Sequence, residues 1–235
     1  PPMPDEAVDI DPETGEPTAY SFVLRIVPDF EARAPDPSTP GPLEVSSTEY
    51  RFADQSDVDA SGDGLIELEG PVDVAGKVWY PTDASAGSHP LVLVVHGRRL
   101  GASTSYLGFD YLARRLASWG MIVVSIDAND TLAGGDLETI TDTARLAQAH
   151  LRCWSAWAGG AAGPAHCDDP ALGSLFGGRI DPTRVGLIGH SRSGQAVRET
   201  YNLVRSDGSA FDIRAVAELA PTDTTPPGVT PTDVA

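Results

Sequence analysis

The sequence predicts an α/β fold in which a doubly wound sheet follows an acidic, mainly antiparallel β portion. From residue 91 onward, apolar strand-like runs alternate with segments of helical periodicity, the pattern of βαβ units. The first of these runs, residues 91–95, is apolar throughout, as expected of a parallel strand covered on both faces. Hydrophobic residues make up 41% of the 235 residues, enough to build one large packed core.

The N-terminal part of the chain is predicted to be acidic and rich in antiparallel β-structure. Residues 1–18 combine prolines with many acids, so we expect an extended acidic arm. β-Branched and aromatic residues then predict strands at 20–27, 43–52, 65–68 and 72–80. Residues 1–89 hold 19 acidic and 4 basic residues, which predicts a strongly acidic surface.

One domain is predicted over residues 19–220, with the antiparallel portion at 19–90 and the βαβ portion at 91–220. The latter holds predicted strands at 91–95, 121–126, 184–188 and 213–219, and predicted helices at 106–119, 137–157 and 193–204. The apolar side of the first helix is predicted to consist of Leu107, Tyr111, Leu112, Leu116 and Trp119. Residues 221–235 are rich in Pro and Thr, so we expect an exposed tail or a cleavage loop.

Charge and hydropathy argue against two classes of protein. A net charge of −18 disfavours nucleic-acid binding, because neutralising phosphates needs clustered Lys and Arg. No apolar run reaches about 18 residues, so no transmembrane segment is expected. The sequence opens at Pro1 rather than at Met, from which we expect that an upstream segment was removed or left out.

Two cysteines, Cys153 and Cys167, flank a stretch rich in Gly, Ala and Pro. The even count and the short loop predict one disulfide, and hence a secreted, periplasmic or cell-surface protein. Two unpaired thiols are the alternative. No further Cys or His stands at metal-ligand spacing, so a zinc site is not expected.

The segment that carries the chemistry runs from a predicted strand through Gly189-His-Ser191-Arg-Ser193 into a predicted helix. This strand–Gly-x-Ser-x-small–helix order is typical of a nucleophile elbow, whose sharp turn exposes the central serine, here Ser191. Small residues are needed two positions to either side, and Gly189 and Ser193 stand there. Ser193 replaces the usual second glycine. A Gly/Ser turn without a catalytic role is the alternative.

A second loop, His96-Gly97-Arg98, directly follows the strand at 91–95. Its position predicts that the backbone N–H of Arg98 joins that of Arg192 in an oxyanion hole, and the two side chains would add positive potential. His96 is interpreted as a structural residue that braces this loop. Asp127, at the end of the strand 121–126, is interpreted as an acceptor for loop N–H groups rather than as a catalytic residue.

Together, LVLVVHGRR (91–99), YLARRLASWGMIVVSIDAND (111–130) and RVGLIGHSRSGQAV (184–197) resemble the α/β-hydrolase superfamily. More narrowly, they are similar to secreted bacterial serine esterases and lipase-like proteins of the chlorophyllase, dienelactone-hydrolase and polyester-hydrolase grouping. The resemblance covers residues 65–223. It implies an α/β-hydrolase sheet and a serine carboxylic-ester hydrolase that acts on an ester substrate through an acyl-enzyme on Ser191, with no cofactor required.

The triad that this resemblance implies is incomplete in the chain, because its acid and histidine should follow Ser191 and no histidine does. Asp223, just past the last predicted strand, is the candidate acid at an alternative strand end. The sheet is expected to be incomplete at its C-terminal edge. We therefore expect a C-terminal segment or second chain to complete the sheet and to supply the histidine. The alternative is a catalytically inactive α/β-hydrolase-like binding or structural module.

Two further groups of residues have both a functional and a structural interpretation. Oxygen-bearing residues at alternate positions predict a structural calcium loop, with an acidic hairpin loop as the alternative: Asp57, Asp59, Ser61 and Asp63. Four residues are candidates for substrate binding, with core packing as the alternative for the aromatic ones. They are Arg99 in the loop after the strand 91–95, Tyr106 at the start of the helix 106–119, and Trp154 and Trp157 at the end of the helix 137–157. Amide hydrolysis or acyl transfer on the same serine is a further alternative to ester hydrolysis.

Overall fold

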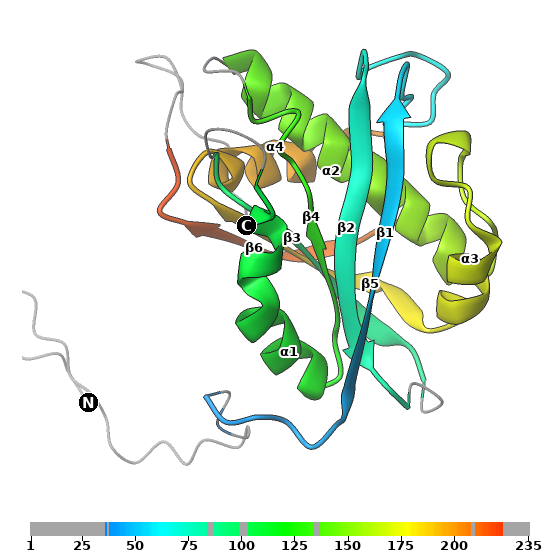
Figure 1. Ribbon diagram of the computed structural model, residues 1–235, viewed down its shortest axis with the longest axis vertical. Helices are drawn as coiled ribbons and strands as arrows, with labels where there is room; N and C mark the ends of the chain where they lie inside the picture. The colour runs from blue at the N-terminus through cyan, green and yellow to red at the C-terminus, as the bar shows by residue number, and fades with distance from the viewer. Residues whose placement is uncertain are drawn as a thin grey trace, which may run out of the picture. The chain divides into compact units, whose positions relative to one another are not determined.

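The computed structural model describes residues 36, 38–83, 87–98, 103–133, 137–207 and 210–222. The chain divides into two compact units, Pro1–Asp36 and Pro37–Ala235. Only Asp36 of the first unit is described, so the predicted arm at 1–18 and the predicted strand at 20–27 lie outside the described residues. Most of the predicted tail at 221–235 does so too. The fold given below is that of the second unit (Figure 1).

A mixed sheet forms the centre of this unit, and within the described residues it has six strands in the order β1-β2-β4-β3-β5-β6. The strands are β1 (Val45–Gln55), β2 (Val72–Pro81), β3 (His89–Val95), β4 (Ile122–Ile126), β5 (Ile180–His190) and β6 (Ile213–Leu219). β1, β2 and β4 pair antiparallel, whereas β4, β3, β5 and β6 pair parallel. The predicted α/β fold, with antiparallel strands before a parallel sheet, is confirmed.

Helices cover both faces of the sheet, as Figure 1 shows. They are the 3₁₀ helices η1 (Ser105–Phe109) and η2 (Ala165–Cys167), and the α-helices α1 (Asp110–Ser118), α2 (Leu137–Ala158), α3 (Pro170–Phe176) and α4 (Arg192–Ser206). Side chains of β3 alternate between the faces: Val92 and Val94 join a core cluster with α1. Leu91, Leu93 and Val95 belong to the larger cluster on the other face, with α2 and α4.

Two predicted elements differ from those observed. Residues 65–68 form no strand, because Leu68 makes only an isolated bridge to Val58. The predicted helix at 106–119 divides into η1 and α1. Its predicted apolar side is wrong at Tyr111, which is 73% exposed, whereas Ala113 and Ala117 are buried. These small side chains let α1 pack closely on the sheet.

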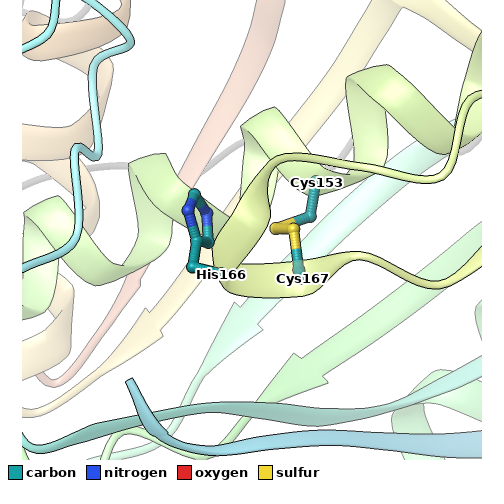
Figure 2. Close-up of side chains that lie close together, drawn as sticks. All are labelled: Cys153, His166 and Cys167. Atoms are coloured by element: carbon teal, nitrogen blue, oxygen red, sulfur yellow. A yellow bond between two sulfur atoms is a disulfide. The ribbon is translucent and has the colours of Figure 1, made fainter. Parts of the chain in front are cut away.

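A disulfide joins Cys153 on α2 to Cys167 on η2, with a Cα–Cα distance of 6.1 Å. It confirms the predicted pairing and closes the loop rich in Gly and Ala that links α2 to η2. His166 lies beside it (Figure 2). No helix in the described ranges is long and apolar enough to cross a membrane.

Candidate active site

The two loops singled out in the sequence meet at one edge of the sheet. β3 and β5 are parallel neighbours, with Val95 opposite Gly189. Their carboxyl ends therefore place the loop that starts at His96 next to the turn at Ser191. Ligands of open α/β sheets bind at this edge.

Ser191 occupies the sharp turn between β5 and α4 in a backbone conformation that few residues adopt. Its φ is +57° and its ψ −125°, and a positive φ is uncommon for any residue with a Cβ. The backbone holds this turn from both sides: the Ser191 N–H donates to the Leu219 carbonyl at 2.9 Å, and the Ser191 carbonyl accepts from the Gly194 N–H at 2.9 Å. This geometry has the form of a nucleophile elbow.

Residues two positions before and after Ser191 leave almost no space at the turn. A Cβ on Gly189 would lie 2.0 Å from the Ser193 carbonyl oxygen, so only glycine fits there. Ser193 is fully buried, and its hydroxyl donates to the His96 carbonyl at 2.6 Å. The serine that replaces the usual glycine therefore ties the elbow to the loop after β3.

The loop after β3 approaches the elbow closely at Gly97. A Cβ there would lie 2.7 Å from His190 Nδ1 and 3.0 Å from Ser191 Cβ. This contact places Arg98 at the same sheet edge as Ser191. Arg192, whose N–H is the other predicted oxyanion donor, is the first residue of α4.

His96 braces the loop, as predicted. Its buried ring accepts from the Ala128 N–H at Nε2, 3.0 Å away, so Nδ1 carries the proton and donates to the Gly97 carbonyl at 2.9 Å. Both ring nitrogens are thus used within the scaffold. Asp127 has the predicted structural role as well, since its Oδ1 accepts from the Asn129 N–H at 3.2 Å.

A pocket of about 600 Å³ opens beside the elbow. Its described lining consists of residues 96–98, 103–105, 108–109 and His190. It combines backbone from the loop after β3 with hydroxyl side chains and one aromatic ring. A pocket of this size next to a strained serine is a candidate active site.

A family model described as PETase, PET hydrolase-like, matches residues 29–232. The chain belongs to the PET hydrolase-like family. Its fold resembles a bacterial heroin esterase, with 19% identity, a TM-score of 0.49, and coverage of 76% of this chain and 45% of that chain. It also resembles esterase B from Lactobacillus rhamnosis HN001, with 22% identity, a TM-score of 0.44, and coverage of 77% and 49%. The chain thus spans about half the length of these two structures. No curated protein matches it.

None of the five histidines of this PET hydrolase-like chain makes a hydrogen bond to the Ser191 hydroxyl within the described residues. His96 is used by the scaffold, and the exposed His190 precedes Ser191 and lines the pocket. His89 begins β3, at the opposite end of the sheet, where its Nδ1 lies 2.7 Å from the Gly120 carbonyl. The remaining two are buried near α2: His150 and His166.

Of the other predicted site residues, two lie outside the described residues and one lies close to the pocket in sequence. Arg99 and Asp223 lie outside the described residues. Tyr106 lies on η1 between two lining residues but is not one of them. Burial, followed by the negative charges of Glu49 and Asp127, raises the pKa of its hydroxyl.

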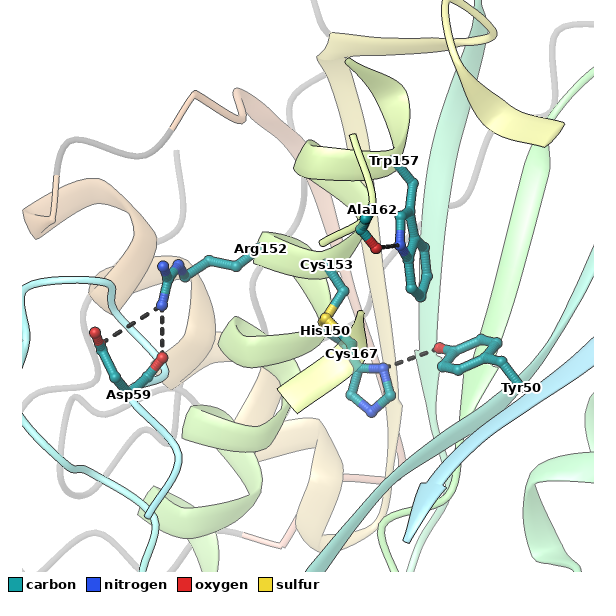
Figure 3. The surroundings of a disulfide bond; sticks show 8 residues. All are labelled: Tyr50, Asp59, His150, Arg152, Cys153, Trp157, Ala162 and Cys167. Atoms are coloured by element: carbon teal, nitrogen blue, oxygen red, sulfur yellow. Dashed lines mark hydrogen bonds and ion pairs between the residues drawn. A yellow bond between two sulfur atoms is a disulfide. The ribbon is translucent and has the colours of Figure 1, made fainter. Parts of the chain in front are cut away.

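The prediction that Trp154 and Trp157 line a substrate groove is wrong. Both indoles are fully buried, and their rings meet edge to face with centroids 5.0 Å apart. Trp157 Nε1 donates to the Ala162 carbonyl at 2.8 Å, so it holds the loop closed by the disulfide (Figure 3). The structure shows core packing, the alternative interpretation. The end of α2 and the loop that the disulfide links to it cover both rings.

Two buried groups lie next to these tryptophans. The Tyr50 hydroxyl lies 2.9 Å from His150 Nδ1, while His150 Nε2 has no hydrogen-bond partner among the described residues. Burial, followed by the charge of His166, lowers the pKa of His150 to about 3. Burial also lowers the pKa of His166. His150 is thus held neutral in the core.

The acidic loop between β1 and β2 brings together only part of the predicted calcium set. Asp59 and Asp63 lie with Glu67, their carboxylates within 4.8 Å of one another, whereas Asp57 is not in this group. Backbone N–H groups already use several of these oxygens: Gly64 donates to Asp59 and Ala60 to Glu67. Asp59 also binds Arg152 of α2 (Figure 3). A calcium ion here stays a prediction.

Proposed function

We propose that this PET hydrolase-like chain carries the nucleophile of a serine carboxylic-ester hydrolase. The single observation that carries the proposal is Ser191, held at φ +57° between β5 and α4 beside a pocket of about 600 Å³. Membership of a hydrolase family supports the reaction class. Serine acyl transfer needs no metal or organic cofactor.

In the proposed reaction, Ser191 Oγ attacks the carbonyl carbon of a bound ester, and the carbonyl oxygen becomes an oxyanion. The N–H groups of Arg98 and Arg192 are the proposed donors to it, and each such donor is worth about 3–4 kcal/mol in a dry site. Collapse of the intermediate breaks the bond to the alcohol and leaves an acyl group on Ser191. Water then attacks this acyl-enzyme and releases the carboxylic acid.

Proton transfer in this scheme requires a base that accepts the Ser191 proton and passes it to the leaving alcohol. Because no histidine bonds to Ser191 within the described residues, we propose that a segment outside these 235 residues supplies it. Asp223, which follows β6 in the sequence, is the proposed acid for that histidine. The disulfide supports a secreted, periplasmic or cell-surface location, where such bonds persist.

Fluorophosphonate labelling of the natural full-length protein tests the proposal, because this probe phosphonylates only activated serines. We expect one adduct by intact mass, mapped to Ser191, and none in Ser191→Ala. The matched control Ser206→Ala removes an exposed serine at the other end of α4 and should still be labelled. If the unmodified protein is not labelled, the hydroxyl is not activated, and the inactive binding module is the correct interpretation.

A further inference from the structure

The pocket beside Ser191 differs in charge from the molecule around it. The whole chain carries a net charge of −18. In contrast, the described lining residues of the pocket include one arginine, Arg98, two imidazoles and three hydroxyl residues at 103–105, and no carboxylate. A local charge of this kind acts over about 10 Å at 0.1 M salt, so nearby groups dominate the field inside the pocket.

Arg98 keeps its positive charge uncompensated within the described residues. Its exposed guanidinium donates only to a neutral acceptor, the Ala133 carbonyl, at 3.3 Å. Other arginines are neutralised: Arg198 binds both oxygens of Glu218, at 2.8 and 2.6 Å, and Arg152 lies 3.5 Å from Asp59. Arg98 is therefore an exposed cation in the lining of the pocket, and no described carboxylate pairs with it.

The neighbouring carboxylate of Asp127 does not take this role. Its Oδ1 accepts from the Asn129 N–H, and its Oδ2 lies 3.9 Å from the Arg51 guanidinium. Asp127 is not among the lining residues of the pocket. The positive charge of Arg98 is thus available to a ligand.

We propose that this pocket selects esters that also bear a carboxylate, such as half-esters of dicarboxylic acids, and that Arg98 is the residue that determines this preference. The inference rests on the proposed function of Ser191. A guanidinium binds a carboxylate through two parallel hydrogen bonds, and the hydroxyls of Ser103, Thr104 and Ser105 offer further donors. Phe109 supplies an apolar wall for the carbon chain between the two functional groups.

The test compares two esters on the full-length protein: mono(4-nitrophenyl) adipate, and the same compound with its carboxylate capped as a methyl ester. The measured quantity is the ratio of kcat/KM for the uncapped over the capped ester. We expect Arg98→Gln to lower this ratio at least fivefold and Arg98→Lys, which keeps the charge, to lower it less. The ratio cancels any effect on the oxyanion hole that both substrates share.

Arg184→Gln is the matched control, because Arg184 lies near the start of β5, at the other end of the sheet, and is paired with Asp181. It removes the same charge and should leave the ratio unchanged. An equal fall of the ratio in both variants would overturn the inference in favour of a general field effect. An unchanged ratio in Arg98→Gln, in protein that the fluorophosphonate labels, would overturn it while the proposed function stands. Absence of labelling would overturn both.

Discussion

Ser191, the proposed nucleophile, has a strained backbone conformation with a positive φ. A positive φ in a residue with a Cβ costs on the order of 1–3 kcal/mol, and the surroundings must enforce it. Here the hydrogen bonds to Leu219 and Gly194 and the close approach of Gly97 do so. The elbow therefore depends on neighbours that take no part in the chemistry.

Gly189 offers the clearest test of this dependence. A methyl group there would lie 2.0 Å from the Ser193 carbonyl oxygen, so Gly189→Ala must displace the elbow backbone. We expect a loss of about 2–3 kcal/mol in the free energy of unfolding, together with loss of fluorophosphonate labelling. Urea unfolding followed by circular dichroism measures the first effect.

The control for Gly189→Ala lies on the same strand. At Gly186, the nearest atom to a new Cβ is Val92 Cγ2 at 3.7 Å, an ordinary contact. Gly186→Ala should therefore change stability by less than about 1 kcal/mol. Equal stabilities for the two variants would show that the close contact at Gly189 relaxes without cost.

At the scale of elements, strands were easier to predict than short helices. Residues 91–95 and 122–126 are buried on both faces, so apolar residues fill both runs except at Ser125, the residue before the end of β4. The helix α3 was not predicted from the sequence, because it has only seven residues and lies between a Gly-rich loop and the next turn. Its signal was present: Asp169 caps it by accepting from the Ala171 and Leu172 N–H groups, and Pro170 follows at the first turn.

The disulfide is the element-scale feature with a measurable contribution. It closes a loop with a sequence separation of 14 residues, for which chain entropy predicts a stabilisation of about 3 kcal/mol. We expect Cys153→Ala/Cys167→Ala to lose about this amount in urea unfolding, and amides of η2 and α3 to exchange faster.

Reduced parent protein is the control for the disulfide, since it lacks the bond but keeps both buried sulfur atoms. If the reduced parent matches the oxidised parent in stability, the crosslink contributes nothing and the loss in the double variant comes from packing alone. A similar loss in the reduced parent and in the double variant is the expected result.

Over the whole molecule, the sequence indicated the position of the reactive serine better than the walls of its pocket. Ser191 and the loop at His96 could be found because a tight turn restricts residue types at fixed spacing. The two tryptophans could not be assigned, because an indole at a helix end suits a core and a groove equally. Their burial depends on Tyr50 and Phe176, which are far away in sequence but meet Trp154 edge to face in the fold.

The stability of the whole molecule should depend on pH through the core histidine. Burial lowers the pKa of His150 to about 3 in the folded protein, whereas an unfolded chain has a histidine pKa of about 6.5. Between these values the unfolded state binds the proton and the folded state does not. The free energy of unfolding therefore falls as the pH falls from about 6.5 toward 3, by on the order of 4 kcal/mol from this group.

Carboxylates titrate in the same pH range, and in a chain of charge −18 their protonation relieves electrostatic repulsion. The contribution of His150 must therefore be measured as the difference in stability between the parent and a variant that lacks the imidazole. His150→Gln removes the titrating ring and keeps an acceptor for the Tyr50 hydroxyl. The stability advantage of the parent over this variant in urea unfolding should shrink steadily from pH 7 to pH 4 because only the parent must bury a protonatable imidazole. Parallel profiles for the parent and His150→Gln would show that His150 is protonated in the folded core without cost.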